Sequence, residues 1–240
     1  MIGLPAFAKS DIGQVRKNNE DSYVCIYPRL YIVADGMGGH VAGEIASSLA
    51  TKTVSEYVQR QDGGSPEVIL GQAVNEANRI IYQMAQSNPE YAGMGTTIVV
   101  AFVDGEKVYW AYVGDSRIYL IREDGMLLLT EDHSVVWELI KSGTITLEEA
   151  KNHPHRNILT RALGTSESVR VDMGKTDWQV GDFLLLCTDG LTNMVSEQDI
   201  FQTIQRYKAD GEKALEELVG RANAAGGLDN ITAILVQREE

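Results

Sequence analysis

The stretch that decides the fold is TTIVVAFVDGEKVYWAYVGDSRIYLIREDGMLLLT, residues 96–130. It contains β-rich runs separated by Asp104-Gly105 and Asp124-Gly125, and Asp-Gly between such runs predicts tight hairpin turns. The alternation of polar and apolar residues is incomplete, and residues 98–103 are apolar throughout, which indicates strands that are covered on both faces. The stretch therefore predicts a meander of antiparallel strands, in a sheet that packs on another sheet with helices outside.

Helical periodicity flanks this β-rich centre. Apolar residues recur at helical spacing from Glu44 to Val58, and Ser65-Pro66 is typical of the start of a second helix. Thr146 with Glu149 and Ser196 with Asp199 resemble capping boxes, and a late helix over 214–225 ends at Gly226-Gly227. Further strands are predicted at 23–26, 30–34, 169–176, 183–187 and 231–236. Because consecutive strands are joined by short turns, the order argues against a parallel βαβ sheet and for an α+β fold.

Composition excludes several classes of protein. The chain has 240 residues, of which 44% are hydrophobic and 23% charged, as expected for a globular protein with a substantial core. The formal net charge of −13 predicts no binding to nucleic acid or to an anionic membrane. No apolar run approaches the roughly 18 residues of a membrane span, so we expect no membrane insertion.

Cysteine usage and the N-terminus bear on location. Cys25 and Cys187 each lie in an apolar stretch, and we expect two buried free thiols rather than a disulfide. The apolar segment near the N-terminus is interrupted by Pro5 and is too short for a signal peptide. We therefore expect a cytoplasmic protein, which could be part of a longer chain.

Four aspartates stand at the ends of predicted strands. Asp35 follows YIVA, Asp115 follows WAYVG, Asp189 follows LLLCT, and Asp229 precedes NITAILV. An Asp beside a Gly is commonly a turn residue, and for each aspartate alone that alternative stays open. Strands packed in one sandwich bring their ends together, however. Crowded carboxylates raise one another's pKa, and a divalent cation among them would relieve that repulsion.

The available ligands favour a hard cation. With four histidines, two cysteines and no His-x-x-x-His, a zinc cage is not expected. Carboxylates, carbonyls and water suit Mg²⁺ or Mn²⁺, which can activate water and stabilise an in-line displacement at phosphorus. Nearby, RKNNED contains Arg16, Glu20 and Asp21; a guanidinium can bind phosphate oxygens while a carboxylate orients it, although a surface charge cluster would look the same.

A nucleotide-binding loop is the rival interpretation of YIVADGMGGHVAGE. The spacing does not fit, because Gly36 and Gly38 are followed by Val41 where a third Gly or Ala should stand. No second parallel strand follows, and the chain contains no GxxxxGK[ST]. We expect instead that these glycines let the carbonyl of Gly36 approach an ion and let a helix begin close by.

Eight motifs in order resemble those of bacterial members of the protein phosphatase 2C (PPM) family. They are RKNNED, VADGMGGHVAGE, GMGTT, VGDSRIY, LTEDHS, HPHRNILTRALG, LLLCTDGL and GLDNIT, and they cover the chain from about Asp11 to Val236. The resemblance implies a four-layer αββα sandwich of the α+β class, in which two central antiparallel sheets are flanked by pairs of helices. It also implies a single catalytic domain over residues 1–240, with a mobile flap subdomain over about 131–164.

The resemblance also implies roles for the metal-binding residues. Asp35 would bridge two metal ions, Asp189 and Asp229 would complete the first site, and the carbonyl of Gly36 would bind the second ion. Glu20 resembles the residue that contacts metal-bound water. Asp115, together with Asp189, resembles the ligands of a third ion in bacterial members.

The remaining roles concern phosphate and the leaving group. Arg16 matches the phosphate-binding arginine of the family, and Asp21 would hold it in place. Animal members have a His directly after the Asp-Gly of the metal site, where this chain has Met37. His40 or a metal-bound water could protonate the leaving group, and a purely structural role for His40 at a helix start stays open.

By resemblance, the chain is a protein serine/threonine phosphatase that hydrolyses phosphoserine and phosphothreonine with water activated by two Mn²⁺ or Mg²⁺ ions. The implied partners are phosphorylated proteins, including a bacterial Ser/Thr kinase and its substrates, and we expect a monomer. One alternative is a non-catalytic phosphoprotein-binding domain of the same fold, which would be expected to lack a metal aspartate; Asp35, Asp189 and Asp229 are all present. Another is a phosphatase dedicated to one regulatory protein.

Overall fold

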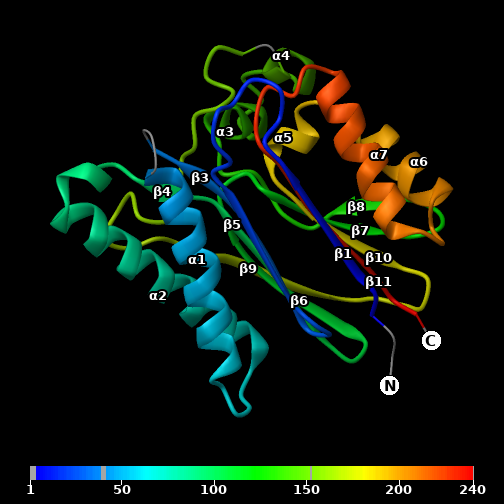
Figure 1. The fold of residues 1–240 in the computed structure, drawn as a ribbon, viewed down its shortest axis with the longest axis horizontal. Coiled ribbons are helices and arrows are strands. Elements are labelled where there is room, and N and C mark those ends of the chain that lie inside the picture. Colours follow the sequence, from blue (N-terminus) through cyan, green and yellow to red (C-terminus); the bar gives the residue numbers. More distant parts are fainter. Residues whose placement is uncertain (1–3, 39–41, 152, 240) are drawn as a thin grey trace.

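Two antiparallel β-sheets lie face to face in the computed structural model, which describes residues 4–38, 42–151 and 153–239 (Figure 1). The first sheet has the strand order β1-β11-β10-β7-β8, so the first and last strands of the chain are neighbours. Its strands are β1 (Ala6–Asp11), β7 (Arg117–Ile121), β8 (Met126–Leu128), β10 (Phe183–Cys187) and β11 (Ile231–Gln237).

The second sheet has the order β2-β3-β5-β6-β9, and a short strand, β4, pairs with the end of β3. All of its neighbouring strands are antiparallel, as the sequence predicts. Its strands are β2 (Asp21–Ile26), β3 (Leu30–Met37), β4 (Gly95–Thr96), β5 (Ile98–Asp104), β6 (Lys107–Val113) and β9 (Asp172–Asp177).

Helices cover the outer face of each sheet. The helices α1 and α2 pack on the second sheet, while α5, α6 and α7 pack on the first (Figure 1). These layers confirm the predicted αββα sandwich. The helices concerned are α1 (Ala42–Gln59), α2 (Pro66–Ser87), α5 (Asp189–Thr192), α6 (Glu197–Arg206) and α7 (Gly211–Ala224).

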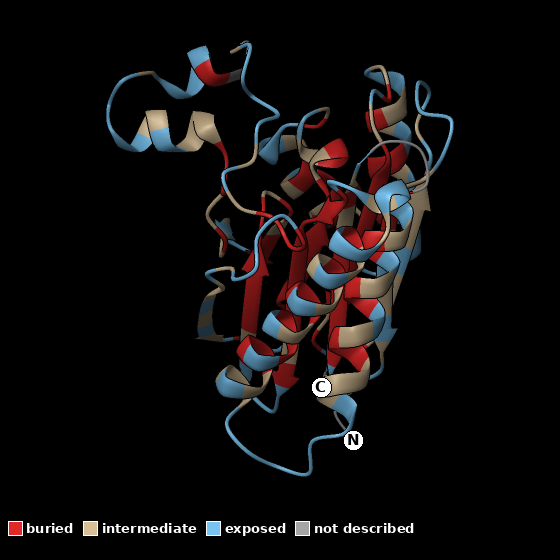
Figure 2. Ribbon diagram, turned by 90° about the vertical axis from the view of Figure 1, so that its left-hand side faces the viewer, coloured by how far each residue is buried: buried red, intermediate tan, exposed pale blue. Residues whose placement is uncertain are grey.

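Three apolar layers hold the sandwich together. The central layer joins side chains of both sheets, among them Tyr31 and Val99 of one and Ile118 and Leu186 of the other, all of them fully buried. The other two layers lie between each sheet and its helices. The inner strands such as β5 are therefore buried on both faces (Figure 2), which explains why residues 98–103 are apolar without alternation.

Both predicted hairpin turns are present. Asp104 pairs with Lys107 at the end of the β5–β6 hairpin, and Gly105 has the positive φ of 61° that this tight turn requires. The second turn joins β7 to β8, where the N–H of Arg122 donates to the carbonyl of Gly125 over 2.8 Å. These two turns set the meander that carries Asp115 between β6 and β7.

The segment predicted as a flap contains two short helices, α3 (Val135–Lys141) and α4 (Leu147–Lys151), drawn together at one end of the sandwich in Figure 1. Ser134 caps α3 by accepting a hydrogen bond from the N–H of Trp137 over 3.3 Å. The predicted capping box of Thr146 and Glu149 is confirmed, with reciprocal bonds of 2.7 and 3.3 Å.

Among the described residues no helix could cross a membrane.

Two features of the structure differ from the expectations. The sequence pattern does not predict the strand β1, because only Ala6, Phe7 and Ala8 are apolar and the segment pairs at a sheet edge. Cys187 is buried as expected, but Cys25 is exposed. The reason is that β2 is an edge strand with alternating exposure, and Cys25 is one of its exposed residues.

Candidate metal centre

The strand ends bring the predicted aspartates into one electrostatic cluster. Asp35 lies near the end of β3, Asp115 between β6 and β7, Asp189 at the start of α5, and Asp229 just before β11. Burial raises the pKa of Asp35 well above its usual range, and the charges of Asp21, Asp189, Asp115 and Asp229 raise it further. Residues far apart in the sequence thus meet at one end of the sandwich.

Neighbouring backbone and hydroxyl groups fix the position of Asp35. Its N–H donates to Oγ1 of Thr97 over 3.0 Å, and its carbonyl accepts from the N–H of Thr97 over 2.9 Å and from Oγ1 of Thr96 over 2.8 Å. The threonines of GMGTT therefore clamp the end of β3 against the start of β5. Since both threonines are buried, the Asp35 backbone is held on a rigid support.

Asp21 lies directly opposite Asp35 in the β2–β3 ladder, and its side chain is buried. Its Oδ2 accepts a hydrogen bond from Oγ1 of Thr188 over 2.9 Å, whereas its buried Oδ1 has no partner among the described residues. Burial raises the pKa of Asp21 to about 7; bonds from Thr232 and Thr188 oppose the shift, and the charges of Asp189 and Asp229 add to it. An unpartnered buried oxygen of this kind is a ready acceptor for a water or an ion.

Gly36 is sterically required. A Cβ at this position would lie 2.1 Å from the carbonyl oxygen of Gly43 and 2.6 Å from that of Glu20. At Gly43 an added Cβ would lie 2.6 Å from Oε2 of Glu20, so the Glu20 carboxylate would have to move. The two glycines let α1 begin against the end of β3 with the Glu20 carboxylate beside it, as the sequence predicts for a helix that starts close by.

Arg16 pairs with Asp229: its Nη2 donates to Oδ2 over 2.7 Å, with both side chains partly exposed. The sequence predicts that Asp21 holds Arg16, and here the structure differs, because Asp21 faces Thr188 from the interior. Burial raises the pKa of Glu20, and the nearby charge of Arg16 opposes that rise. Arg16 is therefore oriented by Asp229 rather than by Asp21.

Asn230 positions the loop that carries Arg16 and Glu20. Its Nδ2 donates to the carbonyls of Ile12 and Asn18, both over 2.9 Å, and its Oδ1 accepts from the N–H of Glu20 over 2.8 Å. The buried side-chain amide of Asn230 thus ties the RKNNED segment to the chain directly after Asp229. The motif GLDNIT contains this asparagine, but sequence reasoning selects only its aspartate.

Asp189 begins the short helix α5. Burial raises the pKa of Asp189 to about 6, and the charge of Asp229 adds to this rise. The side-chain amide of Asn193 donates to Oδ2 of Asp189 over 3.0 Å. Its buried Oδ1 has no partner among the described residues. Asn193 lies one turn along from Asp189, a spacing that a sequence can reveal once a helix start is predicted there.

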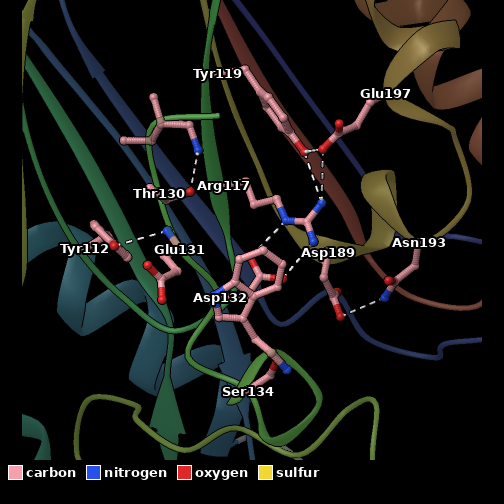
Figure 3. Close-up of polar contacts among 12 residues, drawn as sticks. Tyr112, Arg117, Tyr119, Thr130, Glu131, Asp132, Ser134, Asp189, Asn193 and Glu197 are labelled. Atoms are coloured by element: carbon pink, nitrogen blue, oxygen red, sulfur yellow. Dashed lines mark hydrogen bonds and ion pairs between the residues drawn. The ribbon is translucent and has the colours of Figure 1, made fainter. Parts of the chain in front are cut away.

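Asp115 borders a second polar network, which Figure 3 draws around Arg117 and Asp132. Burial raises the pKa of Asp115 well above its usual range; Asp189 and Asp132 add to that shift, and Arg117 opposes it. Arg117 forms a two-pronged ion pair with Asp132, with bonds of 2.9 and 2.7 Å. Sequence reasoning selects neither partner of this pair as functional, although both lie in the motifs VGDSRIY and LTEDHS.

The histidines of the described segments have structural partners. Nδ1 of the buried His133 accepts from the N–H of Gly114 over 3.1 Å, and its Nε2 lies 3.1 Å from Oδ2 of Asp172. In the flap, Nδ1 of His153 accepts from the N–H of His155 over 3.2 Å. His40, the candidate general acid, lies outside the described residues.

The donor set fits a hard divalent cation. Within the described ranges, no group of three His, Cys, Asp or Glu side chains is placed so that it could hold a metal ion, and Arg16 and Asn193 each engage one of the carboxylates. The orphaned oxygens of Asp21 and Asp189 and the raised pKa values of Asp35 and Asp115 nevertheless mark uncompensated acceptors. Oxygen donors of this type suit Mg²⁺ or Mn²⁺.

A sandwich of this kind with crowded carboxylates at its strand ends is suited to divalent-cation chemistry, and comparisons with known proteins identify its family as one of metal-dependent phosphatases. The family model described as protein phosphatase 2C matches residues 14–220. The chain belongs to the protein phosphatase 2C family, as the sequence motifs predict. It is similar to the serine/threonine phosphatase stp of Listeria innocua, with 42% identity over 238 residues that cover 96% of this chain and 94% of the relative.

Solved structures agree with this assignment. The serine/threonine phosphatase PstP/Ppp of Mycobacterium tuberculosis superposes with a TM-score of 0.93 at 35% identity, and all of both chains is covered. A catalytic domain of PstP in complex with two manganese ions has a TM-score of 0.91 and 34% identity, again over all of both chains. The family uses Mn²⁺ or Mg²⁺, so the predicted cofactor class is confirmed.

Proposed function

We propose that this chain is a protein serine/threonine phosphatase that hydrolyses phosphoserine and phosphothreonine with two bound Mn²⁺ or Mg²⁺ ions. The observation that supports it most directly is the crowded group of Asp35, Asp189 and Asp115, which are half-buried and whose pKa values are raised by desolvation and by the charges of neighbouring aspartates. Membership of a metal-dependent phosphatase family gives this cluster its chemistry. The relatives named above are themselves described as serine/threonine phosphatases.

The proposed ligands are oxygens of the residues that the sequence selects. Asp35 would bridge the two ions. Asp189 and Asp229 would complete the first site, and the carbonyl of Gly36 would bind the second ion. Glu20 would contact metal-bound water. A third ion would bind at Asp115 and Asp189. Bound there, the ions supply Lewis-acid charge to the phosphoryl group and lower the pKa of water so that it can attack phosphorus.

Arg16 is the proposed phosphate-binding residue. Its side chain is about half exposed, and it is anchored at one prong by Asp229, which leaves further N–H groups to face a phosphoryl group. A cation at this place also offsets the charge of −13, which otherwise repels a phosphorylated substrate. Asp21 lies opposite Asp35 in the β2–β3 ladder, and its carboxyl acts on the charge of Asp35 rather than on the orientation of Arg16.

The finer assignments follow from the same site. We propose that the described segments form a single catalytic domain with a flap over about 131–164, and that it works as a monomer. The substrates would be phosphorylated proteins, including a Ser/Thr kinase and its targets. A cytoplasmic location is supported by the two free thiols, since the cytoplasm keeps thiols reduced.

The non-catalytic alternative is not favoured. A domain that only binds phosphoproteins has no need for several crowded and partly desolvated carboxylates, because desolvating uncompensated acidic groups destabilises a fold. Here Asp35, Asp189 and Asp115 are half-buried with raised pKa values, and Asp229 lies beside Arg16. A fold that retains such a costly group is expected to use it.

The test is hydrolysis of matched phosphopeptides by the purified chain. Peptides of one sequence that carry phosphoserine, phosphothreonine or phosphotyrosine are compared in the presence of Mn²⁺ and of excess chelator. We expect release of phosphate from the phosphoserine and phosphothreonine peptides with Mn²⁺, and none with chelator. Full activity in chelator, or no activity with any of the peptides, would refute the proposal.

A further inference from the structure

Arg117 is an arginine held in the interior beside the acidic cluster. Its Nε and Nη2 donate to the two carboxylate oxygens of Asp132 over 2.9 and 2.7 Å, a two-pronged pair in which the side chains are only 23% and 13% exposed (Figure 3). The remaining prong, Nη1, donates to the hydroxyl of Tyr119 over 3.0 Å. A planar guanidinium with all its edges engaged fixes the direction of its partners.

The network extends to a third element. The hydroxyl of Tyr119 donates to Oε1 of Glu197 over 3.0 Å, and Nη1 of Arg117 lies 3.7 Å from the same oxygen. Glu197 is the first residue of α6, while Tyr119 is fully buried in β7. Arg117 therefore joins β7, the strap of residues 129–133 and the start of α6 (Figure 3).

The place of Arg117 in the sheet links it to two proposed ligands. It stands two residues after Asp115, and in the β10–β7 ladder it pairs with Cys187, two residues before Asp189. Arg117 thus begins the strand that follows Asp115 and lies beside the strand that leads to Asp189. The positive charge of Arg117 lowers the pKa of Asp115, whereas the charges of Asp189 and Asp132 raise it.

Asp132 in turn lies at the base of the flap. The strap that contains it is hydrogen-bonded at both ends: the N–H of Leu129 donates to the carbonyl of Ile118 in β7 over 2.8 Å, and the N–H of His133 donates to the carbonyl of Gly114, between β6 and β7, over 3.0 Å. The returning end of the flap closes on the same point, because the N–H of Thr160 donates to the carbonyl of His133 over 2.8 Å. Holding Asp132 therefore holds both ends of the flap.

We propose that Arg117 is a positioning residue: by clamping Asp132 to β7 it holds the base of the flap against the Asp115–Asp189 edge of the metal centre. In this way it couples order in the flap to divalent-cation binding at that edge. The cation-binding part rests on the proposed function; the part that concerns the flap base does not. A pure stability role explains the geometry less well, since a buried ion pair adds little net stability compared with apolar side chains.

The test compares Arg117→Lys, which keeps the charge and loses the two-pronged geometry, with Asp132→Asn, which keeps the shape and loses the charge. Arg79→Lys is the matched control, because Arg79 forms a two-pronged pair with Glu76 on the exposed surface of α2. Mn²⁺ binding by the whole chain is measured by calorimetry, and amide hydrogen exchange of His133 and Thr160 is measured without metal.

We expect both site variants to bind the weakest class of Mn²⁺ about tenfold less tightly, the usual effect of removing a group that orients a metal ligand. Exchange at His133 and Thr160 should accelerate by about tenfold or more, because the hydrogen bonds at the flap base open more readily. The rate of phosphopeptide hydrolysis should fall at low Mn²⁺ and recover as Mn²⁺ is raised. The Arg79→Lys control should match the wild type in every measurement.

Exchange rates and Mn²⁺ affinities equal to those of the control would overturn the inference, even if the melting temperature fell. If Arg117→Lys does not fold, Asp132→Asn and Tyr119→Phe test the same hydrogen-bond network, because each removes a group that Arg117 contacts. Failure of the proposed function gives a different result: wild-type protein without metal-dependent hydrolysis. In that case the exchange at the flap base still decides the role of Arg117.

Discussion

Arg16 and Asp229, which are 213 residues apart in the sequence, form a 2.7 Å ion pair that joins the loop before β2 to the segment that leads into β11. The pair places the proposed phosphate-binding arginine directly on a proposed metal ligand. The two sites of the reaction are thereby adjacent, so that one phosphoryl group can contact the arginine and the cations together.

Replacing Arg16 by Ala should raise KM for a phosphopeptide by about tenfold or more, since a charged hydrogen bond to phosphate contributes about 1.5–3 kcal/mol. The value of kcat should change less, because the carboxylate cluster remains. Arg60→Ala is the control, as Arg60 pairs only with Glu56 on the surface of α1 among the described contacts. Steady-state kinetics that show an unchanged KM would remove Arg16 from the site.

Activity and metal-free stability should respond in opposite directions to Asp35→Asn. Hydrolysis with Mn²⁺ should drop to background, because a neutral amide is a poor ligand for a hard cation. The metal-free protein should melt at a higher temperature than wild type, since one member of a set of mutually repelling buried carboxyls has been neutralised. Asp124→Asn, at an exposed turn, serves as the control. A lower melting temperature for Asp35→Asn would contradict this account of the cluster.

Stability of the metal-free protein should fall as the pH rises from about 4 to about 7. Burial raises the pKa of Asp189 from its ordinary 3.8 to about 6, and that of Asp21 to about 7. Across this window the folded protein binds more protons than the unfolded chain, so raising the pH favours unfolding. For each carboxyl, a rise of one in pH within the window lowers the free energy of unfolding by at most about 1.4 kcal/mol.

Thermal unfolding measured at several pH values checks this dependence. Added Mn²⁺ should raise the melting temperature more at pH 7 than at pH 5, because the cation favours the deprotonated ligands. Asp189→Asn should show a shallower loss of stability across the same window. A metal-free protein whose stability rises steadily from pH 4 to pH 7 would mean that the carboxyls are not crowded as described.

Gly36→Ala should destabilise the protein and weaken Mn²⁺ binding together. The added Cβ would lie 2.1 Å from the carbonyl oxygen of Gly43, so α1 and the end of β3 must move apart. We expect a loss of about 1–3 kcal/mol, which is typical when a well-packed site is overfilled. Gly125→Ala is the control, because a Cβ there meets nothing within 4 Å. Equal melting temperatures for the two variants would contradict the steric argument.

The sequence predicts most of the fold because the hairpins and helices are specified locally. Asp104-Gly105 and Asp124-Gly125 mark their turns, and the strands between them are apolar on both faces because two layers cover them. The strand β1 escapes prediction because an edge strand with few apolar residues has no strong local pattern. Its structure depends on a partner, β11, at the other end of the chain.

The site is only partly predictable for a similar reason. The aspartates are marked by their places at strand ends, but the contacts among them depend on packing. Asp21 follows Glu20 and lies close to Arg16 in the sequence, yet the alternation of β2 turns it inward to Thr188. The supporting roles of Asn230 and Arg117 are also hidden in the sequence, because Asn230 bonds to Glu20, far away in the chain, and Arg117 bonds to Asp132, outside its own strand.

The most direct test of the central claim is anomalous diffraction from crystals of this protein soaked in Mn²⁺. We predict two strong manganese peaks among the carboxylates of Asp35, Asp189 and Asp229, with metal–oxygen distances of about 2.1 Å and one ion on the carbonyl of Gly36. Manganese bound elsewhere, or no peak within reach of these oxygens, would contradict the account.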